Sequence, residues 1–283
     1  MRLNRTRWAL VFSCMAVIVA SALYQMHAGA QLAPATYVSE SPRARNLDAS
    51  LYVQTSAEYQ ASCYQAYNLA ALRLKQFCCS RVDSSKPAAV IMDLDETVLN
   101  NAGFQASQLR SGLAYDQRLW DDWEENHSKH LGLVPGAKRF ILEATKMGVK
   151  VIYVSNRNQN FIDHTKEALV RLELPIVEGG LLLNTESNDK TPRFQRVKEK
   201  YDVLLMIGDN LRDFEEQFKC PDLGQKTPEQ LEAAIQTRKD RVDQAEGSFG
   251  ERWIILPNPT YGEWTKPLGL GDRDFDRLVK AEK

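Results

Sequence analysis

The apolar positions of the chain follow two patterns. Short, mostly apolar runs bounded by polar residues or glycine span Ala88–Met92, Val149–Val154, Val203–Ile207 and Trp253–Leu256. Longer segments have apolar residues at helical spacing and span Ser56–Phe77, Ala137–Met147, Phe161–Leu172 and Pro192–Lys200. Buried runs that alternate with amphipathic helices indicate an α/β fold, a doubly wound parallel sheet with helices on both faces.

A long insertion separates the first two main strands. It comprises roughly forty residues, more than an ordinary crossover needs, so we predict a small cap over about 99–134. Trp120 and Trp123 lie in it, and either line the entrance to a site or anchor the insertion; anchoring is favoured for at least one of them. His127 and His130 have no evident third metal ligand, which favours a solvated helix face.

The N-terminus has the pattern of an export signal. Arg2, Arg5 and Arg7 precede the uncharged run Trp8–Tyr24, and Ala28-Gly29-Ala30 follows as a small-residue cleavage site. We therefore expect the protein to be exported, either periplasmic or secreted. The alternative is an uncleaved N-terminal anchor or an outer-membrane location, because the apolar run is slightly long for a signal.

These patterns divide the chain into three parts. We predict a signal peptide at 1–30, a flexible segment at 31–50 and one folded domain at 51–283, with no stable membrane insertion once the signal is removed. Hydrophobic residues make up 43% of the chain and charged residues 26%, which is typical of a folded domain. The formal net charge of −1 provides no basic excess, so we do not expect a nucleic-acid polymer as a partner.

The predicted mature part contains an even number of cysteines. An even number permits disulfides in an oxidising compartment, although buried free thiols are also common. The spacing leaves their pairing open. The four are Cys63, Cys78, Cys79 and Cys220.

Polar groups follow three of the predicted strands. Asp93 and Asp95 come after the first, Ser155 after the second, and Asp209 and Asp213 after the third. Ligands of open parallel sheets bind outside the carboxyl ends of the strands, so these groups are expected to meet in one crevice. Converging carboxylates repel one another unless a cation joins them. We therefore predict one Mg²⁺ per site.

The same groups suit the hydrolysis of a phosphate monoester. Asp93 can attack phosphorus, and Asp95 can protonate the leaving oxygen and later deprotonate water. Lys190, at the start of a predicted helix, supplies an ammonium. Ser155, Asn156 and nearby backbone amides can bind phosphate oxygens.

Four segments carry a resemblance to a known family. They are Asp93-Leu94-Asp95-Glu96-Thr97-Val98, Ser155-Asn156-Arg157, Lys190 and Gly208-Asp209-Asn210-Leu211-Arg212-Asp213-Phe214. They resemble the motifs of the haloacid dehalogenase superfamily and, more narrowly, of the class C acid phosphatases. The segments Tyr64-Gln65-Ala66-Tyr67-Asn68 and Leu256-Pro257-Asn258-Pro259-Thr260-Tyr261-Gly262-Glu263-Trp264 extend the likeness to most of the chain beyond about residue 50.

The resemblance implies a role for each matching position. Asp93 matches the nucleophile, and Asp95 matches the acid/base, whose backbone carbonyl also helps to hold the metal. Ser155 matches the phosphate-binding hydroxyl, and Lys190 matches the lysine of the third motif. Asp209 matches the metal-binding acid, and Asp213 matches a supporting acid. The family's usual substrates are small monoesters, often nucleoside 5′-monophosphates and aryl phosphates, at acid pH. The resemblance also implies that the protein forms a homodimer. Asn100 stands where the family often has an acid, and the lipid-attachment cysteine of its lipoprotein members has no convincing match.

Several positions have two interpretations. Tyr261 and Trp264 either form a stacking platform for a nucleobase or pack their Pro/Gly loop on the core. Asp213 either supports the site or caps a helix. Arg157 either contacts phosphate or pairs with an acid on the surface.

The whole chain also admits more than one function. The favoured hypothesis is an extracytoplasmic phosphomonoesterase that acts on small phosphate monoesters. The alternatives are a nucleotide-binding module without turnover and a phosphotransferase to alcohol acceptors. The presence of a nucleophile beside an acid/base favours an enzyme over a pure binder.

Overall fold

The structure is a computed structural model that describes residues 46–81, 85–113, 115–223 and 227–268. The predicted signal peptide at 1–30 and most of the predicted flexible segment lie outside these residues. At the end of that segment the structure has a helix, which begins at Leu47. None of the helices in the described ranges is long and apolar enough to cross a membrane.

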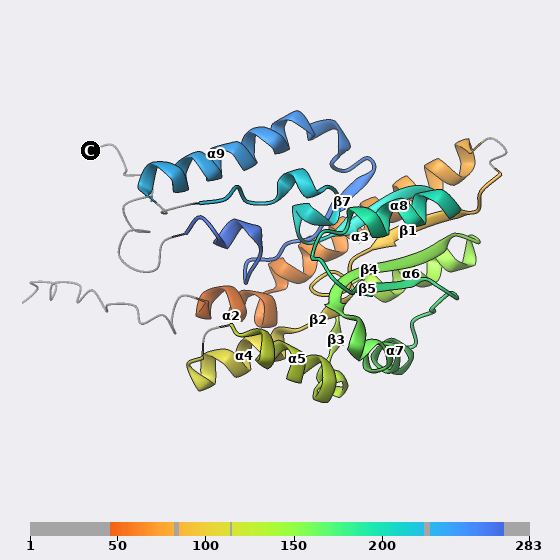
Figure 1. The fold of residues 1–283 in the computed structure, drawn as a ribbon. Helices are drawn as coiled ribbons and strands as arrows, with labels where there is room; N and C mark the ends of the chain where they lie inside the picture. The colour runs from red at the N-terminus through yellow and green to blue at the C-terminus, as the bar shows by residue number, and fades with distance from the viewer. Residues whose placement is uncertain (1–45, 82–84, 114, 224–226, 269–283) are drawn as a thin grey trace, which may run out of the picture. The chain divides into compact units, whose positions relative to one another are not determined.

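A parallel five-stranded sheet forms the centre of the fold (Figure 1). Its strands, in spatial order, are β5 (Leu181–Asn184), β4 (Lys150–Asn158), β1 (Ala88–Met92), β6 (Asp202–Gly208) and β7 (Trp253–Ile255). Every neighbouring pair in this sheet is parallel, which confirms the predicted fold class. The strand order places β1 at the middle, between β4 and β6, so that the carboxyl ends of these three strands are adjacent.

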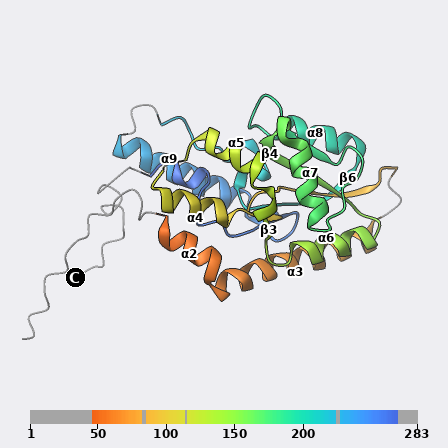
Figure 2. The same ribbon diagram turned by 90° about the horizontal axis from the view of Figure 1, so that it is seen from below.

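The two faces of the sheet bury different clusters of side chains. Val90 and Met92 of β1 belong to one core, and Ala89 and Ile91 belong to the other, as the period of two along a strand requires. The helices α3 (Ala57–Ser80) and α6 (Ala137–Lys146) cover the first face, and α8 (Thr191–Lys200) covers the second. Figure 2 shows α3 and α6 side by side, with α8 on the opposite side of the sheet.

The insertion after β1 folds as a small helical unit. Its ends, β2 (Leu99–Asn100) and β3 (Gly132–Leu133), pair as antiparallel strands. The helices α4 (Ala102–Ser111) and α5 (Gln117–Asn126) and the 3-10 turn η1 (Ser128–His130) lie between them. The paired ends bring this cap back to the sheet close to where it left.

Outside the cap, two helices and one strand of the described residues were not predicted from the sequence. They are α2 (Leu47–Thr55), β5 and α9 (Pro228–Gln244). The helix α9 buries only Leu231 and Ala234, so its apolar periodicity is weak. The remaining elements are α7 (Ile162–Arg171) and the 3-10 turns η2 (Gln159–Phe161), η3 (Leu211–Asp213), η4 (Glu216–Phe218), η5 (Glu246–Ser248) and η6 (Glu263–Thr265). All four cysteines of the predicted mature part are free thiols.

One buried hydrogen bond ties α3 to the loop that follows β1. The Tyr67 hydroxyl donates to the carbonyl oxygen of Thr97 at 2.6 Å, and the Tyr67 side chain is fully buried. Its ring also packs against Phe140 of α6. The helix α3 thus fixes the position of the loop that carries Asp93 and Asp95.

We expect Tyr67→Phe to lower the free energy of unfolding by about 1–2 kcal/mol, because it leaves the Thr97 carbonyl without its donor. Urea denaturation would measure the change, with an unaltered slope against denaturant. Tyr64→Phe is the matched control, since Tyr64 lies on the same helix with an exposed side chain. Equal stability of the two variants would contradict this role for the Tyr67 hydroxyl.

Candidate active site

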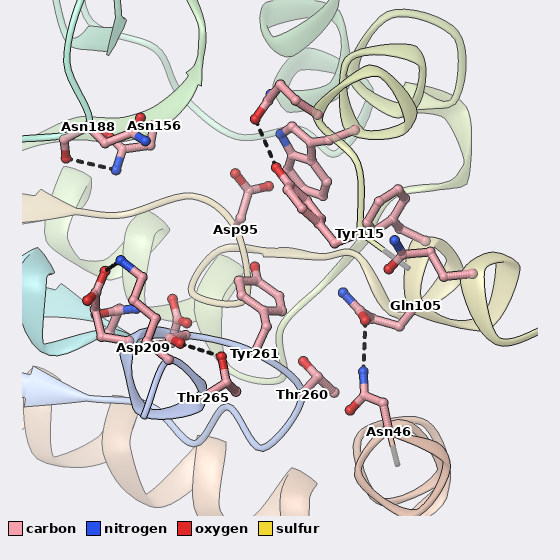
Figure 3. A pocket seen from close by; sticks show the side chains of 18 of the residues that line it. Asn46, Asp95, Gln105, Tyr115, Asn156, Asn188, Asp209, Thr260, Tyr261 and Thr265 are labelled. Carbon is pink, nitrogen blue, oxygen red and sulfur yellow. Dashed lines mark hydrogen bonds and ion pairs between the residues drawn. The ribbon is translucent and has the colours of Figure 1, made fainter. Parts of the chain in front are cut away.

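The carboxyl ends of β1, β4 and β6 open into one cavity of about 730 Å³. Asp93, Asp95, Ser155, Lys190 and Asp209 line it, so the tips of separate strands do meet. Figure 3 shows Asp95, Asp209 and Tyr261 around the same space, with Gln105 and Tyr115 of the cap region on one side. Asn156, Asp213 and Tyr261 also contribute to its lining.

Lys190 lies between two of the acids. Its ammonium donates to Asp93 Oδ1 at 2.5 Å and to Asp213 Oδ1 at 2.7 Å, and its side chain is only 4% exposed. Burial alone would lower the pKa of Lys190, but Asp213 and Asp93 outweigh it and raise the pKa. Lys190 therefore remains a cation in the lining of the cavity.

Asp93, Asp209 and Asp213 form a cluster of acids. One oxygen from each lies within 4.8 Å of the others. Burial raises the pKa of Asp93 and of Asp209 well above the usual value, and the neighbouring carboxylates add to the effect. One ammonium is insufficient for three converging carboxylates. A cluster of oxygen ligands without cysteine or histidine suits a hard divalent cation such as Mg²⁺, Mn²⁺ or Ca²⁺.

The orientation of Asp209 is determined by two uncharged donors. Thr97 Oγ1 donates to Asp209 Oδ1 at 3.0 Å, and Asn258 Nδ2 donates to Oδ2 at 2.8 Å. Hydrogen bonds of this kind orient the carboxylate ligands of metal sites. Both donors lie within segments of the family resemblance, but the sequence did not identify either of them as a site residue.

Asp213 makes a capping contact and also lies in the site. It lies at the end of the turn η3, where its Oδ2 accepts a hydrogen bond from the backbone amide of Asn210 at 2.9 Å. Its Oδ1 accepts from Lys190. A Cβ atom on residue 208 would collide with the Asp213 side chain, so Gly208 permits this close approach.

Asp95 lies in a different environment from Asp93. Its Oδ1 accepts from Arg157 Nη2 at 2.8 Å and from Asn101 Nδ2 at 2.9 Å. Arg157 is completely buried. It therefore pairs with an acid, as one of the two interpretations held, but this pair is internal and not on the surface.

The end of β4 is braced by Arg193 of α8. Arg193 donates to the carbonyl oxygen of Ser155 at 2.5 Å and to Asn156 Oδ1 at 2.6 Å, and Asn156 Nδ2 donates to the Asn188 carbonyl at 3.1 Å. The Asn156 side chain is thus engaged within the protein. The Ser155 hydroxyl lies 3.4 Å from Asp95 Oδ2.

The two predicted aromatic site residues behave differently. Tyr261 lines the cavity, and its hydroxyl donates to Glu96 Oε2. Burial, followed by the nearby Asp95, raises the pKa of Glu96 to about 7. Trp264 does not line the cavity: its side chain is 43% exposed and its indole N–H donates to the Tyr261 carbonyl. The role of Trp264 in substrate binding therefore stays a prediction.

The two cap tryptophans also differ. Trp120 lines the cavity, and its ring lies 5.8 Å from the guanidinium carbon of Arg157. Trp123 is buried among cap residues and stacks on His127. Trp123 therefore anchors the insertion, in line with the favoured interpretation. Asn100 accepts a hydrogen bond from the backbone amide of Ala102 at 2.8 Å, at the start of α4, and does not line the cavity.

The sequence did not indicate several residues of the site. They are Thr97, Asn101, Arg193 and Asn258, with Gln105 and Tyr115 on the cap side. Their chemistry depends on which partner they contact, and polar residues of these types are frequent in loops. Only their position next to a motif residue or a cap helix could have suggested them.

Comparison with known proteins identifies the family. The family described as "HAD superfamily, subfamily IIIB (Acid phosphatase)", where HAD denotes haloacid dehalogenase, matches residues 15–264. The structure of the class C acid phosphatase from Bacillus anthracis is similar, with 30% sequence identity and a TM-score of 0.72 over 85% of this chain and 99% of that chain. The crystal structure of that class C acid phosphatase with tungstate bound gives the same identity and TM-score over 86% of this chain and 99% of that one.

These matches agree with the resemblance inferred from the four motifs. They extend over the parallel sheet, the cap and the cluster of acids together. The chain therefore belongs to the acid phosphatases of haloacid dehalogenase subfamily IIIB, which are phosphoric monoester hydrolases of the class C type.

Proposed function

We propose that this acid phosphatase hydrolyses small phosphate monoesters with Mg²⁺ and forms an aspartyl-phosphate on Asp93. The observation that carries the proposal is the meeting of Asp93, Lys190 and the acids Asp209 and Asp213 at one end of the sheet. An anionic ester needs positive charge to approach a carboxylate. Lys190 supplies part of that charge.

Asp93, Asp209 and Asp213, with the backbone carbonyl of Asp95, would hold the magnesium ion. When bound, this ion neutralises negative charge on the acids and on the transferring phosphoryl group. Its identity as Mg²⁺ rests on the all-oxygen ligand set and on the family resemblance. Asp209 is already oriented for this purpose by Thr97 and Asn258.

The protein residues carry the two chemical steps. In the first, a carboxylate oxygen of Asp93 forms a bond to phosphorus while the bond from phosphorus to the leaving oxygen breaks, and Asp95 gives its proton to that oxygen. In the second, Asp95 takes a proton from water as the water oxygen attacks phosphorus. This releases phosphate and regenerates Asp93. Ser155 and the backbone amides beside it would bind the phosphate oxygens.

The chemical lining of the cavity supports a substrate with a ring-bearing leaving group. Tyr261, Trp120, Tyr115 and Phe104 contribute aromatic surface to its lining. Aromatic faces stack on nucleobases and aryl groups. Nucleoside 5′-monophosphates and aryl phosphates are therefore the proposed substrates. The export pattern of the N-terminus and the family resemblance also lead us to propose an exported protein that can form a homodimer.

Asp93→Asn is expected to lower kcat by at least about 10³-fold, since the amide can neither attack phosphorus nor be regenerated. The assay is turnover of a chromogenic phosphate ester at acid pH. The thermal unfolding midpoint shows whether the variant is folded. Normal turnover by Asp93→Asn would contradict the proposed nucleophile.

A chelator is expected to abolish turnover and added Mg²⁺ to restore it, because the cluster of acids needs a cation. Mg²⁺ is also expected to raise the thermal unfolding midpoint, since a ligand that binds the folded state stabilises it. Asp209→Asn is expected to weaken both effects. Asp222→Asn is the matched control, because Asp222 lies outside the cavity. Full activity in the chelated protein would contradict the metal requirement.

A further inference from the structure

The carboxyl group of Asp95 is held on one side by buried donors. Its Oδ1 accepts three hydrogen bonds, from Arg157 Nη2 at 2.8 Å, Arg157 Nε at 2.9 Å and Asn101 Nδ2 at 2.9 Å. Its Oδ2 has only longer contacts, 3.2 Å to Arg157 Nε and 3.4 Å to Ser155 Oγ. The carboxyl group is therefore anchored mainly through Oδ1, and Oδ2 is held less closely.

The amide of Asn101 has only one consistent orientation. Its Oδ1 receives Trp123 Nε1 at 2.9 Å and Arg157 Nη2 at 3.2 Å. An indole N–H and a guanidinium can only donate, so the amide oxygen must face them. The amide nitrogen must then face Asp95. The backbone amide of Asn101 also donates to Glu96 Oε1 at 2.9 Å, which ties it to the β1 loop.

Trp123 connects this arrangement to the cap. It belongs to α5, stacks on His127 at a ring separation of 5.3 Å and packs against Phe104 of α4 at 5.8 Å. A continuous series of hydrogen bonds thus runs from the cap helix through Asn101 to the Asp95 carboxyl group.

We propose that Asn101 and Arg157 are positioning residues that orient the Asp95 carboxyl group for proton transfer, and that α5 maintains their position through Trp123. The inference rests on the proposed role of Asp95 as general acid and base. Proton transfer depends steeply on distance and angle, so a freely rotating carboxyl group would be a poorer acid.

The arrangement goes beyond what stability requires. Arg157 is completely buried, and taking a guanidinium out of water is costly even when it is paired. An apolar residue of similar volume would fill the same space. The buried guanidinium instead directs two N–H groups at a single oxygen of Asp95, which determines the direction of that carboxyl group.

The test compares kcat/KM for two substrates, a nitrophenyl phosphate and an alkyl phosphate. A nitrophenolate leaves without protonation, whereas an alkoxide needs a proton from the general acid. Asn101→Ala and Trp123→Phe are expected to lower kcat/KM for the alkyl ester at least roughly tenfold more than for the nitrophenyl ester. The loss is expected to be larger for Asn101→Ala, which is closer to Asp95.

Two reference variants make the outcome decisive. Asp95→Asn should show the same selectivity in more extreme form. Asn126→Ala should show none, because the Asn126 amide donates to Asp122 on the exposed side of α5. Thermal unfolding midpoints identify variants that do not fold. If Asn101→Ala does not fold, the test uses Trp123→Phe, which retains an aromatic ring at this position.

The possible failures are distinguishable. Equal losses for both substrates in Asn101→Ala and Trp123→Phe, with selective loss in Asp95→Asn, would overturn the positioning inference and leave the function of Asp95 intact. Absence of selectivity in Asp95→Asn itself would contradict the proposed acid. A merely structural role for Asn101 would lower the active fraction and reduce both substrates by the same factor.

Discussion

The arrangement of the site depends on one buried ammonium group. Lys190 reaches Asp93 at 2.5 Å and Asp213 at 2.7 Å in a place where its side chain is only 4% exposed. A buried charge is tolerated only when it is paired and hydrogen-bonded, so Lys190 and the two acids require one another. Asp209 adds a third carboxylate that Lys190 alone does not neutralise. This residual negative charge is the physical reason why the cluster suits a divalent cation.

Two acids that are two residues apart in the chain thus acquire different surroundings. Asp93 faces an ammonium and other carboxylates, whereas Asp95 faces the guanidinium of Arg157 and the amide of Asn101. Separate environments are the usual means by which a protein assigns different functions to similar carboxyl groups. Here Lys190, at the start of α8, and Asp213 of η3 surround Asp93, whereas Arg157 of β4 and Asn101 at the beginning of the cap surround Asp95. The cap is therefore connected to the chemistry as well as to the shape of the cavity.

Much of the framework could be predicted from the sequence. The strand β1 has the predicted bounds, and the central helices lie within a few residues of their predicted positions, because periodic burial leaves a local pattern. The helices α2 and α9 were missed, since their apolar faces are short and their docking depends on distant partners. The position of Trp264 outside the cavity lining could not be predicted for a related reason. A tryptophan beside the site residue Tyr261 has the composition of a stacking platform, but the direction of its ring depends on the loop conformation.

The sequence by itself determined that acids, a hydroxyl and a lysine occur at the ends of buried strands and the start of a helix, because these positions are encoded by short apolar runs and their neighbours. Only the tertiary structure decided which group each polar side chain contacts. The bond of Lys190 to Asp93 joins residues 97 positions apart, and that of Arg157 to Asp95 joins residues 62 positions apart. Contacts over such separations arise from the packing of whole elements, and hydrophobic periodicity contains no information about them.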